Sequence, residues 1–158
     1  MQLRTTIHPG DIGEIVRMHG VLYAREYNLD RTFEGYVAAG LGAFAVGFDE
    51  AKDRLWIAEH DQRILGSIAI VGQPDGTAQL RWFLVHPDAR GSGLGRRLIT
   101  EALAFCRERG FPWVFLWTIA GLAASAHLYS DAGFRLTDEK THALWGGLHT
   151  EQRYALKL

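Results

Sequence analysis

The sequence has little of several features that mark particular classes of protein. It holds a single cysteine among 158 residues, so no intramolecular disulfide can form. That residue, Cys106, lies at helical spacing from Leu94, Leu98 and Ala102, which predicts a packed thiol rather than a nucleophile. A chain without disulfides suits a reducing compartment, and we expect a cytoplasmic protein.

An excess of charge of one sign is also missing. Lysine and arginine together number 17 and aspartate and glutamate 18, for a formal net charge of −1. Nucleic-acid-binding domains usually carry a basic face, so nucleic acid is not expected as a partner of this chain alone.

The start, "MQLRTTIHPGD", lacks the pattern of a secretory signal, and no apolar run approaches the length of a membrane span. No membrane partner is expected either.

Metal and nucleophile motifs are absent as well. The seven histidines form no His-Glu-x-x-His pair and no cluster with cysteine, so we predict no metal site. No Gly-x-Ser-x-Gly pattern is present, because Ser92 stands one residue out of register with it. The sequence therefore points away from metallohydrolases and serine hydrolases.

Hydrophobic residues make up 47% of the chain, enough for one compact domain over residues 1–158. "QLRTTI" alternates like a strand, and "HPGDIGEIV" opens a helix with Asp11 and Glu14 at capping-box spacing. A second helix is predicted from Thr32 to about Phe48. "RLWIAEH" and "ILGSIAIV" then form a hairpin around residues 60–63.

The second half of the chain continues the alternation. "TAQLRWFLV" is almost continuously apolar, which favours a central strand covered on both faces, and Pro87 ends it. A helix from Leu94 to Gly110, the strand "WVFLWTI", the helix "LAASAHLYSDAG" and the closing strands "FRLTDEKTHAL" and "QRYALKL" follow. The predicted fold is α/β (α+β), a mixed central sheet of about seven strands flanked by about four helices, with one parallel pair.

A glycine-rich turn, "RGSGLG" from Arg90 to Gly95, connects the central strand to the next helix. Such a turn presents free backbone N–H groups and the positive end of a helix dipole, which together suit a phosphate. It lacks the third glycine of a dinucleotide fingerprint, where Arg96 stands, and the Gly-Lys-Ser/Thr of a P-loop. A tight connection that holds no ligand is the alternative interpretation.

Two stretches resemble the GNAT N-acetyltransferase superfamily. "RGSGLG", preceded by "VHP", is similar to its pyrophosphate-binding motif, and "AHLYSDAGF" is similar to its later helix with a Leu-Tyr pair followed by Gly-Phe. Further upstream, "HGVLYAREYNLDRTFEGYVA" resembles the first helices of GNAT domains fused behind MarR-type winged-helix regulators. The chain has no winged helix, so it is expected to be either a free-standing relative or an excised domain.

The resemblance implies transfer of the acetyl group of the co-substrate acetyl-CoA to an amine by direct attack. A backbone N–H near Leu84 or Val85 would polarise the acetyl carbonyl. A hydrogen bond to the pantetheine arm is in doubt, because Leu122 stands where relatives often have asparagine. The expected coenzyme-binding residues are Leu84, Val85, Arg90, Gly91, Ser92, Gly93, Leu94, Gly95 and Arg96.

The resemblance also assigns two proton transfers. Tyr129 aligns with the tyrosine that protonates the departing thiolate, with a packing role as the alternative. An ammonium must lose a proton before it can attack, yet Gln79 stands where relatives often place a glutamate. We predict Glu59 as the base, with Glu26 and His19 as open alternatives.

In the family the first two helices wall the acceptor pocket. The candidate acceptor-binding residues are therefore His19, Tyr23, Glu26, Tyr27 and Trp82, for a small-molecule amine or an exposed amino group. A homodimer through the last strand or Trp145 is compatible with the sequence but not required by it. Three functions stay open: an N-acetyltransferase, an acyl-CoA-binding regulatory module without turnover, and a structural domain with an empty glycine turn.

Overall fold

The computed structural model describes all 158 residues and contains one seven-stranded sheet in the order β1-β2-β3-β4-β5-β7-β6. Only β4 and β5 are parallel, as predicted. The element order and the α/β class are confirmed. The elements are β1 (Gln2–Arg4), α1 (Asp11–Tyr27), α2 (Arg31–Val46), β2 (Arg54–His60), β3 (Arg63–Gly72), β4 (Ala78–Val85), a 3-10 turn (Pro87–Ala89), α3 (Leu94–Glu108), β5 (Trp113–Ile119), α4 (Ala123–Asp131), β6 (Arg135–Leu144) and β7 (Gly147–Lys157).

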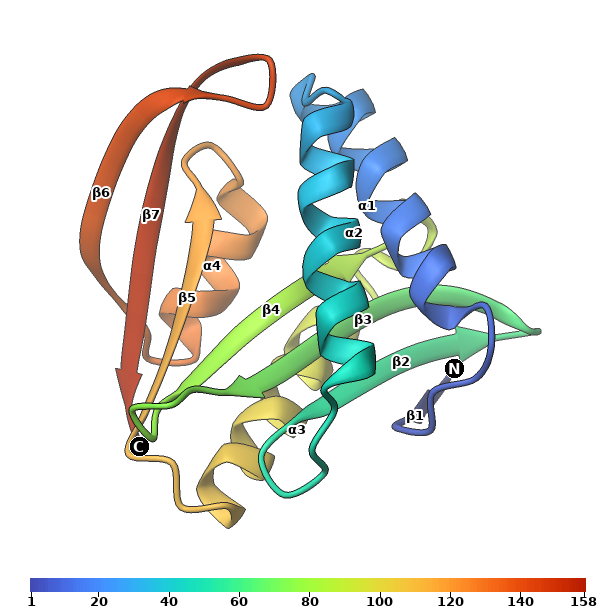
Figure 1. The fold of residues 1–158 in the computed structure, drawn as a ribbon, viewed down its shortest axis with the longest axis vertical. Helices are drawn as coiled ribbons and strands as arrows, with labels where there is room; N and C mark the ends of the chain where they lie inside the picture. Colours follow the sequence, from blue (N-terminus) through green and yellow to red (C-terminus); the bar gives the residue numbers. More distant parts are fainter.

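Helices cover both faces of the sheet (Figure 1). The helices α1 and α2 bury their apolar side chains in a core on one face, with Ile15, Leu41 and Ile57 fully buried. On the other face α3 supplies Leu98 and Ala102 to a second core, which also encloses Cys106 as predicted for a packed thiol. Burial of such side chains is the main favourable term for the fold.

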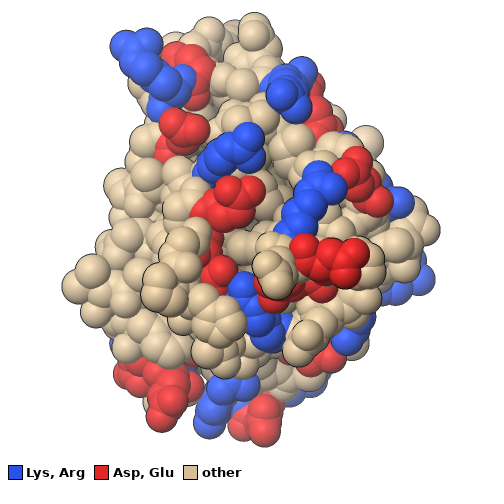
Figure 2. Space-filling view, turned by 90° about the vertical axis from the view of Figure 1, so that its right-hand side faces the viewer, with Lys and Arg blue, Asp and Glu red and all other residues tan.

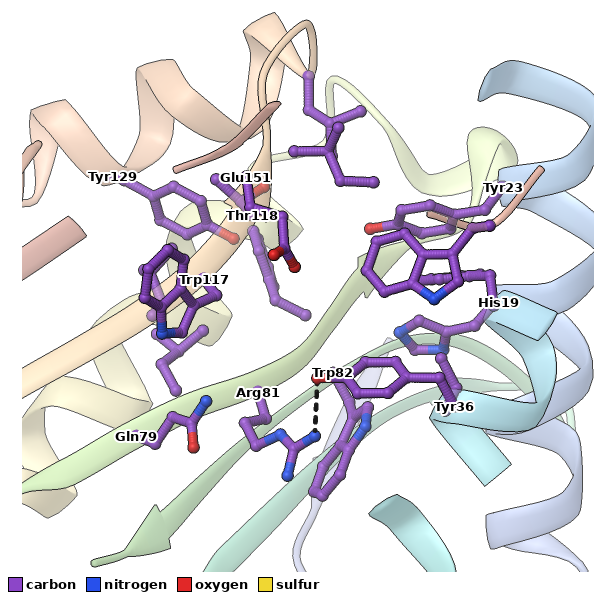
Figure 3. A pocket seen from close by; sticks show the side chains of 18 residues that line it. His19, Tyr23, Tyr36, Gln79, Arg81, Trp82, Trp117, Thr118, Tyr129 and Glu151 are labelled. Atoms are coloured by element: carbon purple, nitrogen blue, oxygen red, sulfur yellow. Dashed lines mark hydrogen bonds between the residues drawn. The ribbon is translucent and has the colours of Figure 1, made fainter. Parts of the chain in front are cut away.

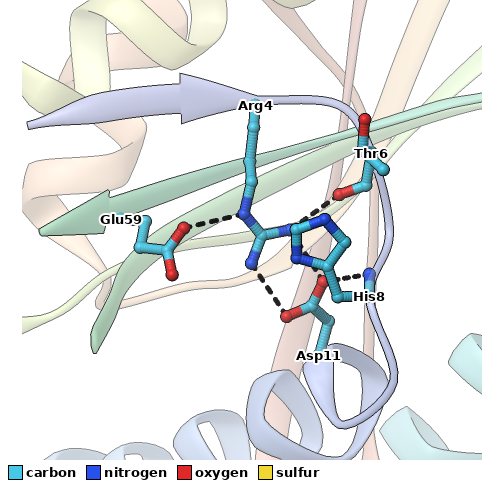
Figure 4. A network of polar contacts seen from close by, with 5 residues as sticks. All are labelled: Arg4, Thr6, His8, Asp11 and Glu59. Carbon is cyan, nitrogen blue, oxygen red and sulfur yellow. Dashed lines mark hydrogen bonds and ion pairs between the residues drawn. The ribbon is translucent and has the colours of Figure 1, made fainter. Parts of the chain in front are cut away.

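The start of α1 differs from the predicted capping box. Its N-cap is Gly10, at φ 95°, and no side chain caps the helix. The Asp11 carboxylate instead accepts the His8 amide at 2.6 Å and pairs with Arg4 at 2.7 Å (Figure 4). Arg4 also donates from Nε to Glu59 at 2.8 Å. A capping box needs only contacts within the first turn of the helix. The Asp11 carboxylate instead pairs with Arg4, which the sheet places beside it.

The central strand β4 pairs with β5 at only two positions, Ala78 with Val114 and Gln79 with Phe115. Beyond them the strands diverge and leave a wedge in the sheet (Figure 1). The main chain of β4 after Gln79 thus lacks a partner on its β5 side. The strand contributes Ala78 and Leu80 to the core beneath α3 and Trp82 and Leu84 to the core beneath α1 and α2, so it is covered on both faces as predicted.

A bulge in β4 accompanies this divergence. Ser67 pairs with Leu84 and Ala69 with Arg81, so two residues of β4 oppose one residue of β3. Trp82 lies in the bulge at φ 49°, and the Ser67 hydroxyl donates to its carbonyl oxygen at 2.8 Å. Bulges bend a strand and increase its twist. The bulge therefore turns β4 away from β5 at the place where the wedge opens.

The β6–β7 hairpin brings its turn to the top of α2. The Asp30 amide donates to the Trp145 carbonyl at 3.1 Å, and the Trp145 ring lies 5.0 Å from that of Phe33, centre to centre. Trp145 is therefore used within the chain, and the dimer stays a prediction. The edge strand β6 is exposed and carries "DEK" at its middle, a pattern that discourages pairing with other sheets.

The surface agrees with the balanced composition. On the side of the molecule in Figure 2, acidic and basic side chains are interspersed, with no large area of one sign. None of the helices combines the length and apolar character that a membrane-spanning helix needs.

Candidate active site

The glycine turn leaves a run of backbone donors free. None of the amides from Gly91 to Arg96 donates a hydrogen bond within the chain. Gly93 is the N-cap of α3, with no side-chain cap, so the positive end of the helix dipole also opens here. Free donors at a helix N-terminus suit a phosphate.

The three glycines of the turn have different tasks. Gly91 and Gly93 have φ of 75° and 84°, in the region that glycine adopts without strain, and a side chain there would meet no neighbour. At Gly95 the approach of α4 leaves little room, because a Cβ there would lie 2.9 Å from the Leu128 Cδ1 and the Leu128 side chain would have to shift. The first two therefore shape the turn, and the third lets α3 pack beside α4.

A groove extends from this turn between α1 and α4. Most of the predicted coenzyme-binding residues line it, but Ser92 does not, because its hydroxyl donates to the Ala89 carbonyl at 2.6 Å. The lining residues are Leu22, Tyr23, Glu26, Tyr27, Phe83, Leu84, Val85, Ala89, Arg90, Gly91, Gly93, Leu94, Gly95, Arg96, Leu122, Ala124, Ser125 and Leu128. We call this surface the coenzyme groove.

The two arginines of the turn are engaged by carboxylates. Arg90 makes a two-pronged pair with Glu26 of α1, at 2.8 and 2.7 Å, and donates from Nε to the Val85 carbonyl. Arg96 pairs with Asp131 of α4 at 3.0 Å. The Glu26 carboxylate therefore lies beside the glycine turn, where it opposes the binding of an anion.

A second cavity lies where β4 and β5 diverge (Figure 3). Eight of its 18 lining residues are phenylalanine, tyrosine or tryptophan. The lining residues are His19, Tyr23, Phe33, Tyr36, Val37, Gln79, Leu80, Arg81, Trp82, Phe83, Leu116, Trp117, Thr118, Ile119, Leu122, Tyr129, Trp145 and Glu151. We call this cavity the aromatic pocket. Tyr23, Phe83 and Leu122 line both it and the coenzyme groove, so the two spaces meet.

Tyr129 and Tyr23 present phenols to the aromatic pocket from opposite walls (Figure 3). Burial raises the pKa of Tyr129 well above its ordinary value, and the nearby phenols of Tyr23 and Tyr154 add to this. Burial likewise raises the pKa of Tyr23. Both groups are therefore neutral hydrogen-bond donors throughout the physiological pH range.

His19 forms part of the wall. Its Nδ1 lies 2.8 Å from the Ile15 carbonyl, so the neutral ring donates to the backbone of its own helix. Burial lowers the pKa of His19 to about 4, against the opposing effect of that hydrogen bond. A ring that resists protonation this strongly is a poor proton acceptor for an ammonium group.

Three of the residues predicted for the site lie outside the aromatic pocket: the predicted base Glu59 and the predicted acceptor-binding residues Glu26 and Tyr27. Glu59 is held by Arg4 at the β1–β2 edge and lines neither space. Glu26 and Tyr27 line the coenzyme groove instead, because the last turn of α1 lies beside the glycine turn. His19, Tyr23 and Trp82 do line the pocket.

Sequence reasoning missed several residues of the pocket, above all Glu151. This glutamate comes from β7, opposite Ile119 of β5, and its side chain is 22% exposed. Trp145 and Tyr36 were missed as pocket residues too. A closing strand gives no local signal for such a role; only the pairing of β7 with β5 brings Glu151 to the wedge.

The model of the acetyltransferase (GNAT) family matches residues 22–134, and the chain belongs to this family. A mycothiol acetyltransferase of Thermobifida fusca is 35% identical over 97 residues, 59% of this chain and 28% of that protein. The chain spans about a quarter to a half of the length of the curated relatives it matches.

Solved structures share the fold over nearly the whole chain. An acetyltransferase of the GNAT family from Staphylococcus aureus Mu50 superposes with a TM-score of 0.82 at 18% identity, covering 99% of this chain and 98% of that one. A Salmonella typhimurium protein solved with its cofactor acetyl-CoA gives 0.75 at 18% identity, covering 100% and 94%. These likenesses confirm the predicted GNAT fold.

Proposed function

We propose that this chain is an N-acetyltransferase that uses acetyl-CoA and acetylates a small-molecule amine. The observation that carries the proposal is the junction of two spaces at the β4–β5 wedge. One begins at six free amides, and the other holds the buried phenol of Tyr129. The names of the relatives add support, since those of T. fusca and of the human N-acetyltransferase 8B both specify acetyl transfer.

The residues present fit the parts of the co-substrate. The amides from Gly91 to Arg96 would hold the diphosphate, at the positive end of α3. The main chain of β4 after Gln79, which lacks a partner on its β5 side, would supply the donor that polarises the acetyl carbonyl. Leu122 and Ser125 border the groove where a pantetheine arm would pass.

Tyr129 would protonate the departing thiolate. Its phenol is neutral, buried and directed into the aromatic pocket. The ordinary pKa of a thiol lies about 1.5 units below that of a phenol. Burial that raises the pKa of Tyr129 also raises that of a thiolate formed beside it, so the energy difference for this proton transfer stays modest. The proton would return to Tyr129 from the amine nitrogen after attack.

The acceptor would enter the aromatic pocket, which favours a small molecule. Trp145 packs on Tyr36 and Phe33, so the turn between β6 and β7 forms one wall beside α2. The stretch from His19 to Ala38 that resembles domains fused to MarR-type regulators forms part of α1 and α2, the same wall. We infer kinship with those domains from it.

Two measurements test the proposal. Calorimetry with acetyl-CoA should show binding, and release of CoA thiol should rise when a panel of primary amines is added. Absence of binding overturns the assignment. Binding without amine-dependent thiol release would instead favour a regulatory module that senses acyl-CoA.

A further inference from the structure

Glu151 is the only carboxylate among the residues that line the aromatic pocket. It lies on β7 between Ile119 of β5 and Lys140 of β6, and its carboxylate points into the cavity (Figure 3). Its Oε2 lies 2.8 Å from Nε2 of His142 on β6. The His142 side chain is 44% exposed, so this pair joins the pocket to solvent.

The other carboxylates considered for proton transfer are engaged elsewhere. Both oxygens of Glu26 accept from Arg90, and Glu59 accepts from Arg4. Gln79 lines the pocket, but an amide accepts no proton at neutral pH. Glu151 is therefore the group in the pocket with the charge and the basicity to receive an ammonium.

The rest of the pocket suits a flat apolar body behind the ammonium. Trp117, Trp145 and Tyr36 contribute aromatic surface, and such faces attract cations as well as rings. The one guanidinium, that of Arg81, stacks over Trp82 at 4.4 Å and donates to the Tyr36 hydroxyl. Arg81 is thus held against the opposite side of the pocket in Figure 3.

We propose that Glu151 is the catalytic base for the acceptor and that the acceptor is a primary ammonium on a flat, apolar carbon body. The inference rests on the proposed acetyl transfer. A proton passes from the ammonium to the Glu151 carboxylate and from there to solvent at the exposed His142 side of the pair, while the His142 ring donates from Nε2 to Oε2. His142 is a positioning residue that keeps the carboxylate aimed at the amine.

The freed nitrogen lone pair forms the bond to the acetyl carbon, and the carbon–sulfur bond breaks. The thiolate takes the phenolic proton of Tyr129, which regains one from the new amide nitrogen. One proton leaves per turnover, as the conversion of an ammonium and a thioester to an amide and a thiol requires.

Two probes of similar shape separate the base from other roles. Benzylamine is mostly protonated at neutral pH, whereas the amino group of O-benzylhydroxylamine is already neutral and needs no base before attack. We expect Glu151→Gln to lower kcat for benzylamine by about 10²-fold or more and to change kcat for O-benzylhydroxylamine by less than about threefold. His142→Gln should show the same selectivity with a smaller loss, about fivefold.

Glu139→Gln is the matched control. Glu139 lies on the same hairpin, where it accepts from Gln152 at 2.8 Å and lines neither space. Its kcat should be unchanged for both probes. All three variants should bind acetyl-CoA with unchanged affinity, which also shows that they are folded.

Each outcome decides the inference. An equal loss for both probes in Glu151→Gln, or no loss for benzylamine, overturns Glu151 as the base. A wild-type protein that acetylates other amines but neither probe overturns the acceptor class. Failure of the wild-type protein to bind acetyl-CoA or to acetylate any amine overturns the proposed function itself.

Discussion

The coenzyme groove and the aromatic pocket meet at one wedge in the sheet, but they are built differently. The end of the groove that carries the glycine turn is made by main-chain amides of six consecutive residues, 91–96. The pocket is made by side chains from six elements, which range along the chain from His19 to Glu151. The first depends on backbone conformation, and the second on how distant strands and helices pack.

The two regions also differ electrostatically. The groove offers helix-dipole and amide donors to an anion, with Glu26 beside them as an opposing charge. The pocket offers aromatic surface and one carboxylate, Glu151, to a cation. A co-substrate with a diphosphate and an acceptor with an ammonium would therefore be directed to different spaces.

The largest effect is expected from a charge placed in the glycine turn. Gly93→Asp puts a carboxylate beside the diphosphate position, and repulsion of about 4 kcal/mol at 4 Å should weaken CoA binding by about 10³-fold. Gly93→Asn has the same shape and also tolerates the φ of 84°, so it should cost about tenfold or less. Calorimetry with CoA compares the two, and similar affinities would contradict an anion site there.

The next largest effect is expected in the free energy of unfolding, and it comes from His19 in the wall of the aromatic pocket. The pKa of His19 is about 4 in the folded chain against 6.5 ordinarily, so the unfolded state binds the proton more readily. Stability from the neutral ring is present above pH 6.5 and is lost as the pH falls toward 4, by about 3 kcal/mol.

Urea unfolding at pH 7 and pH 4 measures this loss. In His19→Gln the decrease in unfolding free energy between these pH values should be smaller than in the wild type by that amount. His127→Gln, at an exposed site on α4, should behave like the wild type. If His19→Gln loses as much unfolding free energy between pH 7 and pH 4 as the wild type does, the His19 ring is not held neutral in the folded chain.

Removal of the Tyr129 phenol tests the wall of the aromatic pocket beside Phe83, a residue that also lines the coenzyme groove. Tyr129→Phe keeps the ring that packs on Phe83 and Phe134 but removes the hydroxyl. We expect kcat to fall by about 10²-fold with no change in acetyl-CoA affinity. Because the pKa of Tyr129 is raised, wild-type kcat should not decline through ionisation of this phenol up to pH 10. If Tyr129→Phe keeps the wild-type kcat, Tyr129 has a packing role and does not protonate the thiolate.

The smallest effect is expected at the border of the groove. Glu26→Gln removes the charge that occupies Arg90, leaving the guanidinium free for the diphosphate. Partly exposed ion pairs contribute up to about 1 kcal/mol, so CoA should bind about two- to fivefold more tightly at low salt. Glu14→Gln, on the same helix and paired only with Arg17, serves as the control. Weaker binding in Glu26→Gln would indicate that this pair supports the groove.

The parts predicted well from sequence are those with a local cause. Gly91 and Gly93 identify the turn because only certain residues adopt positive φ easily, and the period of Leu94, Leu98 and Ala102 identifies α3. The succession of strands and helices along the chain follows from runs of apolar residues and turn signals. Each of these signals lies within a short window of sequence.

The capping box predicted at Asp11 was wrong, and the predicted base Glu59 lies outside both spaces, for one reason. Both carboxylates are taken by Arg4, which β1 places between them. The pattern around Asp11 is typical of a cap, but an ion pair with a residue in another element displaces it. Glu26 is similar, since Arg90 lies 64 residues away in sequence.

By itself the sequence determined the glycine turn, the succession of strands and helices, and the family they indicate, because backbone preference and apolar periodicity act over a few residues. Tertiary structure alone decided which carboxylate faces the aromatic pocket. Glu151 reaches it through the pairing of β7 with β5, while Glu26 and Glu59 are held elsewhere by arginines. A charge is placed by the neighbours that desolvate or pair it, and those neighbours come from distant parts of the chain.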